Sequence, residues 1–341
     1  MEILVFGLIA MRNEYRQPQV TFVREPNELQ PIDVRTLAHL YNLPRESSKL
    51  SGDTLSSLTA RIASKKLWTY APVKYSPLLG GPRICSISLD FLEITEINEM
   101  PETFVLIHGA WHTGEAFETI ANILRDAGHT VYCPTLRGNR PEDDRSKLGL
   151  EDAISSVVEF IEESDLTDIR LVGHSYAGMV ISGVADRLEK RTRRLVYINA
   201  FVPLKGQSLN DMVTPDYAVA FAATAGANNG AILLPFEIWR ENFINDADIA
   251  LARSTYDRLN PQPYRTFTDK ISLQRPLSEL SIGKSYINCQ QDISLPHSYP
   301  WHPRLSERLG LFRLVEMPGS HETIFSNPTG LAQAIWEAAR D

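Results

Sequence analysis

The sequence predicts an α/β fold built on a mostly parallel sheet with helices on both faces. From Glu102 onward, short apolar runs alternate with amphipathic segments, which is the pattern of such a sheet. One of these runs, 169–172, ends at a serine between small residues, and a helical segment follows it. Residues 1–98 lack this pattern. We therefore expect two parts, an N-terminal extension over 1–98 and an α/β domain over 99–341.

Composition excludes several classes of protein. The 341 residues are 43% hydrophobic and 22% charged, as in ordinary globular proteins, and the formal net charge is -8. The negative charge disfavours nucleic acid and anionic membranes as partners. Cys85, Cys133 and Cys289 form neither a disulfide framework nor a set with metal-ligand spacing. The apolar start lacks the basic region and cleavage site of a signal peptide, so we expect a cytoplasmic protein.

The first 98 residues carry no recognisable motif. Apolar runs at 3–10 and 20–23 suit strands, and 31–43 and 50–67 have helical spacing. Exposing so many apolar side chains to water is unfavourable, yet the segment is too short to bury them in a large core of its own. We expect a small α/β appendage of unknown role that docks on the larger domain or on a second subunit, and a homodimer is left open as a partner.

The larger domain follows in regular order. Strands are expected over 104–107, 130–133, 169–172, 194–198, 285–289 and 311–315. Helices are expected over 114–126, 150–163, 179–188 and 328–339. The long interval 201–284 lacks strand signals and contains several helical stretches. It predicts a helical cap inserted between two strands.

The segment Leu171–Gly178, LVGHSYAG, carries the most specific signal. A strand, a sharp turn with Ser175 at its apex and a helix resemble the nucleophile elbow of α/β-hydrolases. The serine must stand on a strained turn, and the close strand and helix require small neighbours, here Gly173 and Ala177. A serine hydroxyl also needs a base and an orienting acid.

The order serine, acid, histidine selects the partners of Ser175. Of the histidines that follow it, His321 lies in a loop directly after the last strand, where such sheets place catalysis. His297 and His302 lie in a proline-rich loop and suit the surface. Asp292 follows the strand that ends at 289, and it is the expected acid. Asp246 and Asp248 suit surface or helix-capping roles.

The remaining site residues come from the turns beside the serine and the first strand. The backbone N–H groups of Tyr176 and Ala110 are expected to stabilise the oxyanion. His108 and His174 are interpreted as buried structural histidines. For the substrate pocket we expect walls from Gly109, Trp111, Phe221 and Trp239. Because the chain offers no dinucleotide glycine cluster, P-loop or metalloprotease histidine pair, neither a cofactor nor a metal is expected.

These motifs resemble the plant methylesterase and hydroxynitrile lyase branch of the α/β-hydrolases and its bacterial relatives. The matching pieces are FVLIHGAW at 104–111, GHS at 173–175, YINAFVP at 197–203, YINC at 286–289 ahead of Asp292, and GSH at 319–321. The family usually has glycine at Ala177, and an acidic residue or threonine at Gln291. Residues 1–98 have no counterpart there.

The resemblance implies a hydrolase rather than a lyase. The lyases carry a threonine after the first motif histidine and a lysine after the catalytic one, where this chain has Gly109 and Glu322. We therefore expect a serine hydrolase that cleaves a small apolar or aromatic ester or lactone through an acyl-enzyme. Two alternatives stay open, a cofactor-free lyase, cyclase or oxygenase of a natural-product pathway, and a non-catalytic small-molecule receptor.

Overall fold

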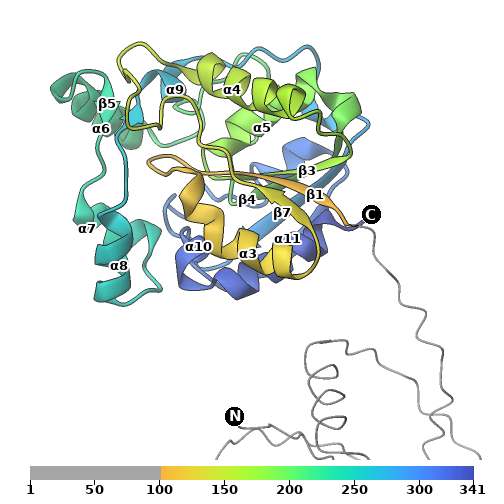
Figure 1. Ribbon diagram of the computed structural model, residues 1–341. Coiled ribbons are helices and arrows are strands. Elements are labelled where there is room, and N and C mark those ends of the chain that lie inside the picture. Colours follow the sequence, from red (N-terminus) through yellow and green to blue (C-terminus); the bar gives the residue numbers. More distant parts are fainter. Residues whose placement is uncertain (1–100) are drawn as a thin grey trace, which may run out of the picture. The chain divides into compact units, whose positions relative to one another are not determined.

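A six-stranded parallel sheet organises the part of the chain that this computed structural model describes, residues 101–341 (Figure 1). The predicted extension over 1–98 lies outside the described residues. The strand order is β2-β1-β3-β4-β7-β8, and every pairing in this sheet is parallel. The strands are β1 (Thr103–Ile107), β2 (Thr130–Tyr132), β3 (Ile169–His174), β4 (Thr192–Ile198), β7 (Gly283–Cys289) and β8 (Arg313–Met317).

Alternating side chains divide the core between the two faces of the sheet. In β1, Phe104 and Leu106 enter one apolar cluster, and Val105 and Ile107 enter the other. Helices α3 (Glu118–Asp126) and α11 (Pro328–Ala339) cover the first face, whereas α4 (Leu150–Glu163) and α5 (Ala177–Arg187) cover the second (Figure 1). The predicted layering is confirmed.

The expected elements agree with the structure except at some of their ends. The predicted helix over 114–126 begins as a 3-10 turn, η2 (Gly114–Phe117), before α3. The last strand spans Arg313–Met317 rather than the predicted 311–315. Leu311 is 92% exposed beyond the turn at Gly310, and pairing begins only where Arg313 meets Ser285 of β7. Helix α11 begins where expected, with Pro328 in its first turn and the Asn327 side chain as its cap.

The interval 201–284 contains several short helices, most of which gather beyond the carboxyl ends of the strands (Figure 1). They are α6 (Pro215–Ala227), α7 (Phe236–Ile238), the π-helical turn η4 (Trp239–Phe243), α8 (Ile249–Tyr256), α9 (Arg265–Thr268) and the 3-10 turn η5 (Leu277–Glu279). Two more short elements, η6 (Ser306–Leu309) and α10 (Thr323–Ser326), lie outside this interval, after β7. The interval is not free of strands, because β5 (Ala231–Ile232) and β6 (Gln262–Pro263) form a two-residue antiparallel pair. Strands this short leave no alternating pattern in a sequence.

The strand order places a switch point between β1 and β3. The connection after β1 runs over one face to β2, and the connection after β3 runs over the other face to β4. Loops that diverge in this way leave a crevice at the carboxyl ends of the two strands. Within residues 101–341, no helix combines the length and apolar character needed to cross a membrane.

Candidate active site

Ser175 stands on a strained turn at the end of β3. Its φ of 55° lies in the left-handed region, which costs a residue with a side chain about 1–3 kcal/mol. The strand that follows holds the turn, because Ser175 N–H donates to Ile198 O and Phe201 N–H donates to Ser175 O, both at 3.1 Å. A Cβ on Gly178 would lie 2.1 Å from the Phe201 carbonyl oxygen. The closest approach therefore falls at Gly178, and the methyl group of Ala177 is accommodated.

Three side chains from three loops form one hydrogen-bonded chain. The hydroxyl of Ser175 donates to Nε2 of His321 at 2.8 Å, and Nδ1–H of His321 donates to Oδ2 of Asp292 at 2.6 Å. Ser175 is 7% exposed and His321 is 2% exposed. The loops follow β3, β7 and β8, whose carboxyl ends share one edge of the sheet. The structure thus brings together the three residues that the sequence proposed as nucleophile, base and acid.

Asp292 is held as a buried carboxylate by neighbours on both of its oxygens. Besides His321, the side-chain amide of Asn199 donates to Oδ2, and the N–H and hydroxyl of Ser294 donate to Oδ1 at 2.8 and 2.6 Å. Burial pushes the pKa of Asp292 up, but the charge and hydrogen bond of His321, with these donors, hold it below its usual value. Neither Asn199 nor Ser294 was predicted. The available signal was a polar residue directly after β4, inside the motif 197–203.

Aromatic rings enclose the His321 imidazole. Trp301 stacks on it with ring centroids 5.2 Å apart, and Phe243 contacts it edge-on at 5.3 Å. Burial lowers the pKa of His321, but the Asp292 carboxylate more than offsets this, so the pKa lies above the ordinary histidine value. An imidazolium is therefore stabilised at this position.

The two residues expected to supply oxyanion donors, Ala110 and Tyr176, lie beside Ser175. Tyr176 follows the serine and precedes α5, and Ala110 lies in the loop after β1. Within residues 101–341, neither amide has a protein acceptor. Both residues line the same cavity as Ser175. The arrangement can therefore offer two backbone donors to a negatively charged oxygen beside the serine.

The cap fixes the loop that contains Ala110 through its neighbour Trp111. Trp111 has a φ of 65°, and its N–H donates to the side chain of Gln262 at 3.0 Å. Its carbonyl accepts from Asn260 N–H at 2.6 Å, and its indole N–H donates to Ile232 O at 3.1 Å. The strained conformation of the loop thus depends on residues of the cap.

The cavity above Ser175 is narrow and apolar, with a volume of about 30 Å³. The expected wall residues Trp111 and Phe221 both line it. The full lining is Ala110, Trp111, Ser175, Tyr176, Phe201, Leu209, Val213, Tyr217, Phe221, Phe243, Phe267, Ser294, Leu295, Trp301 and His321. Many of these side chains come from the cap interval 201–284, which therefore supplies much of the pocket.

Two expected wall residues do not reach the cavity. Trp239 is fully buried behind Phe243, on which it stacks, and its indole N–H donates to Ala252 O at 3.0 Å. Gly109 lies behind the nucleophile, because a Cβ there would meet Nδ1 of His174 at 2.8 Å. The prediction that these two residues line the pocket is wrong. In both cases tight packing on a site residue, rather than contact with the cavity, accounts for the residue type.

His108 and His174 are buried and neutral. Nδ1–H of His108 donates to Gly109 O at 2.8 Å, and its Nε2 accepts from Leu136 N–H at 3.1 Å. Nε2–H of His174 donates to the carbonyl of His321 at 2.9 Å. Burial lowers the pKa of each to about 3. Both histidines position loops at the site and carry no charge at neutral pH.

The other polar residues weighed from the sequence occupy varied places. His297 is exposed, and Nδ1 of His302 bonds to the Ser306 hydroxyl at 2.7 Å. Asp248 caps α8, as expected. Asp246 is exposed, yet it accepts the Ser320 N–H at 3.0 Å and so helps to hold the loop that carries His321.

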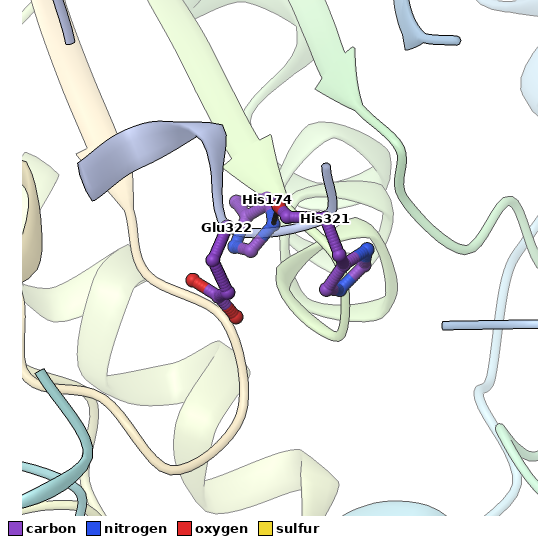
Figure 2. A group of neighbouring side chains, drawn as sticks. All are labelled: His174, His321 and Glu322. Carbon is purple, nitrogen blue, oxygen red and sulfur yellow. Dashed lines mark hydrogen bonds between the residues drawn. The ribbon is translucent and has the colours of Figure 1, made fainter. Parts of the chain in front are cut away.

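One cluster in the described residues has the donor types of a metal site. One nitrogen each of His174 and His321 and a carboxylate oxygen of Glu322 lie within 4.8 Å of one another (Figure 2). His321 is already bonded to Ser175 and Asp292, and both oxygens of Glu322 accept from His112 at 3.1 and 3.2 Å. Binding a metal would break these bonds, so we assign the cluster to positioning rather than to metal binding.

Known proteins resemble the described part of the chain. The model of the family described as the alpha/beta hydrolase family matches residues 104–334. A carbendazim hydrolyzing esterase from a Nocardioides strain is 32% identical over 68% of this chain and 97% of its own. Methylesterase 18 of Arabidopsis thaliana is 24% identical over 69% and 96%.

A solved structure of an extracellular alpha/beta-hydrolase from a Paenibacillus species also matches. It is 37% identical, with a TM-score of 0.68 over 71% of this chain and all of that one. That protein is described as sharing structural and functional homology with tobacco salicylic acid binding protein 2. The predicted resemblance to the plant methylesterase branch and its bacterial relatives is confirmed.

Proposed function

The chain belongs to the alpha/beta hydrolase family, and we propose that it is a serine esterase that cleaves small apolar or aromatic carboxylic esters or lactones through an acyl-enzyme. The observation that carries the proposal is the chain of hydrogen bonds from Ser175 through His321 to Asp292 at the wall of an apolar cavity. Relatives named as esterases support the ester as the reacting group.

The first half-reaction of the proposed mechanism is acylation of Ser175. The Ser175 oxygen attacks the ester carbonyl while its proton passes to Nε2 of His321, 2.8 Å away. Asp292 keeps the proton of the imidazole on Nδ1, which leaves Nε2 free to accept, and it stabilises the imidazolium that forms. The carbonyl oxygen becomes negative, and the N–H groups of Ala110 and Tyr176 stabilise it. The alcohol leaves with the proton from Nε2.

Deacylation repeats these reaction steps with water in place of the serine hydroxyl. A water molecule takes the place of the alcohol and gives a proton to Nε2 of His321 as it attacks the acyl carbon. The tetrahedral intermediate collapses, the Ser175 oxygen recovers the proton, and the carboxylic acid leaves. No further group is needed for either half-reaction.

The cavity lining favours uncharged substrates. Apart from the Ser175 and His321 side chains and the Ser294 hydroxyl, its walls are aliphatic and aromatic side chains, together with the Ala110 and Tyr176 amides. A charged acyl group would lose its hydration there without gaining a partner of opposite charge. Ligand pockets usually hold roughly 300–1,000 Å³. A cavity of about 30 Å³ therefore suits a slim group, and larger ones require Tyr217 or Phe221 of α6 to move.

The surroundings of Glu322 support hydrolysis over cyanide release. Its carboxylate bonds to His112 rather than facing the cavity, whose lining includes no lysine or arginine. A lyase would need a positive charge at this place to help an anion leave. The lyase alternative therefore has no group in the lining to perform that step.

The test is hydrolysis of p-nitrophenyl esters of increasing acyl length, together with a monoester of a dicarboxylic acid. We expect turnover of short apolar acyl groups and a preference of at least about tenfold, in kcat/KM, over the charged acyl group of similar length. Phe221→Ala should widen the cavity and raise kcat/KM for bulky aryl esters. Val219→Ala serves as its control, because Val219 lies on the same helix and is 69% exposed.

Two outcomes would contradict the proposal. One is the absence of hydrolysis of every ester and lactone offered to a folded protein. The other is equal efficiency on the charged and the apolar esters, which would be incompatible with an apolar acyl pocket.

A further inference from the structure

A second buried carboxylate lies directly behind the catalytic histidine. Glu322 follows His321 in the chain, and both of its oxygens accept from Nε2–H of His112, at 3.1 and 3.2 Å. The Glu322 side chain is 2% exposed and the His112 side chain is 3% exposed. Trp239 and Phe325 pack against the His112 ring with centroids 5.8 and 5.5 Å away. Apolar rings thus shield this pair from water, and the hydrolysis steps above do not use it.

The peptide group between His321 and Glu322 is fixed from both sides. Its carbonyl accepts Nε2–H of His174 at 2.9 Å, and its N–H donates to the carbonyl of Phe243 at 3.0 Å. Figure 2 shows the His321 ring and the Glu322 carboxylate pointing to different sides of this backbone, with His174 beside it. The peptide group that joins the base to Glu322 is therefore itself held in place by hydrogen bonds.

The pair connects two loops that must be correctly placed relative to each other for the reaction. His112 belongs to the loop after β1, two residues beyond Ala110, the proposed oxyanion donor. Glu322 belongs to the loop after β8, which carries the base. The bond between His112 and Glu322 spans 210 positions of the sequence. It therefore joins the loop that contains Ala110 to the loop that contains His321.

The Glu322 carboxylate also adds negative charge near His321. One ligand-type atom each of Glu322, His174 and His321 lie within 4.8 Å of one another. The titratable groups that face His321 are Asp292 from the loop after β7, His174 from β3, Glu322 and, farther off, His112 and Asp246. Within the described residues, Glu322 is thus the second carboxylate, after Asp292, that favours a positive charge on the base.

We propose that Glu322 and His112 form a positioning pair for the catalytic histidine, which holds the base loop on the oxyanion loop and stabilises the imidazolium. This inference rests on the proposed esterase function. Neither residue touches the substrate, so both act through His321.

The directions of the pKa shifts agree with this role. Burial lowers the pKa of His321, whereas Asp292 and then Glu322 raise it. Burial would raise the pKa of Glu322, but the interaction with His112, including their hydrogen bond, keeps the pKa below its usual value. His174, with a pKa of about 3, adds no charge at neutral pH.

The test compares kcat and KM of Glu322→Gln with wild type across pH, on an ester that the wild type hydrolyses. Loss of the negative charge lowers the pKa of His321, so the acid limb of the kcat/KM profile should move to lower pH. A weaker base accepts the Ser175 proton less readily, so kcat at the plateau should fall by about two- to tenfold. KM should stay within about twofold of wild type, because the cavity is unchanged.

Substitutions of His112 test the positioning role while the Glu322 carboxylate stays in place. Gln places an amide N–H near the position of Nε2, so His112→Gln should keep the bond to Glu322 and most of the activity. His112→Leu removes the donor and leaves a buried carboxylate without a partner, which should lower both stability and kcat. Equal kcat in the Gln and Leu variants would overturn the positioning role.

The matched control is Glu102→Gln, which removes the carboxylate from the partly buried pair with Arg170 near the other end of β3. It should lower stability and leave the acid limb in place. An acid limb that stays at the wild-type pH in folded Glu322→Gln overturns the proposal. Should that variant not fold, Glu322→Asp decides. It keeps the charge but withdraws it from His112, and an unchanged kcat would count against the pair.

The failure of the function and the failure of this inference are distinguishable. A wild-type protein without ester hydrolysis refutes the esterase. A wild-type esterase with a normal serine dependence, and with Glu322→Gln unchanged in both kcat and acid limb, refutes only the pair.

Discussion

The two ends of the parallel sheet carry similar chemical groups in opposite surroundings. At the amino end, Arg170 pairs with Glu102 and Asp168, and Arg193 pairs with Asp341. Asp168 is 68% exposed and Asp341 is 50% exposed, so water screens much of this network. At the carboxyl end, the carboxylate of Asp292 and the imidazole of His321 are each 1% exposed.

The hollows at the two ends differ in the same way. Around Thr192 and Gly283, the first residues of β4 and β7, lies a hollow of about 530 Å³ lined mainly by polar and charged residues. The apolar cavity at Ser175 has about 30 Å³. The larger hollow has more charge, yet its lining contains no hydrogen-bonded chain of serine, histidine and carboxylate like the one at Ser175. The apolar cavity is therefore the candidate site because it encloses a few hydrogen-bonded polar groups, not because of its size or its charge.

The largest effect should come from the nucleophile. Ser175→Ala removes the attacking oxygen and should lower kcat on the order of 10⁶-fold while the fold is kept. Steady-state hydrolysis and far-ultraviolet circular dichroism measure the two properties. Ser294→Ala is the control in the same cavity, and it should retain far more activity. Substantial turnover by Ser175→Ala would show that the reaction does not depend on the hydrogen-bonded groups at the carboxyl end of the sheet.

The next effect concerns the acid. Asp292→Asn keeps the shape but favours the wrong imidazole tautomer, so kcat should fall on the order of 10⁴-fold. The partners Asn199 and Ser294 remain to hold the side chain. A variant with wild-type kcat would show that another carboxylate orients His321.

The pH dependence should follow the raised pKa of His321. A protonated imidazole cannot accept the Ser175 proton, so activity is present above this pKa and is lost as the pH falls through it. The acid limb of kcat/KM should therefore have its midpoint above about 6.5, the ordinary histidine value. Initial rates between pH 5 and 9 measure it. A midpoint well below that value would mean that Asp292 does not stabilise the imidazolium.

The smallest effect on activity should come from the amino end. Glu102→Gln weakens the pair with Arg170 and should lower the free energy of unfolding by about 1–3 kcal/mol. Thermal unfolding should show a lower Tm, while kcat stays within about twofold. A large loss of kcat with unchanged stability would show that the two ends are coupled.

The sequence predicts the parts of the site that follow directly from strands. Ser175, Asp292 and His321 each follow a buried strand, and parallel strands end at one edge, so their order in the chain was sufficient to bring them together. The helices α4 and α11 begin and end as expected. Amphipathic spacing marks α4, and Asn327 with Pro328 marks the start of α11.

The remaining parts depend on contacts between distant segments, which a single sequence does not encode as a pattern. His112 and Glu322 are 210 positions apart, and Asn199 and Asp292 are 93 apart. Trp239 is a large apolar residue of the kind that often lines a pocket. Its indole N–H instead donates to a carbonyl of α8, which places the ring in the core. The strand pair β5 and β6 is too short to produce a period.

The central claim is that Ser175 becomes covalently acylated, and labelling with a serine-reactive phosphonate tests it most directly. Intact-mass analysis of the wild type should show one adduct, and peptide mapping should place it on Ser175. Ser294→Ala should be labelled in the same way, and Ser175→Ala should remain unlabelled. A folded, ester-hydrolysing wild type with no adduct at Ser175, or with the adduct on Ser294, would contradict the account.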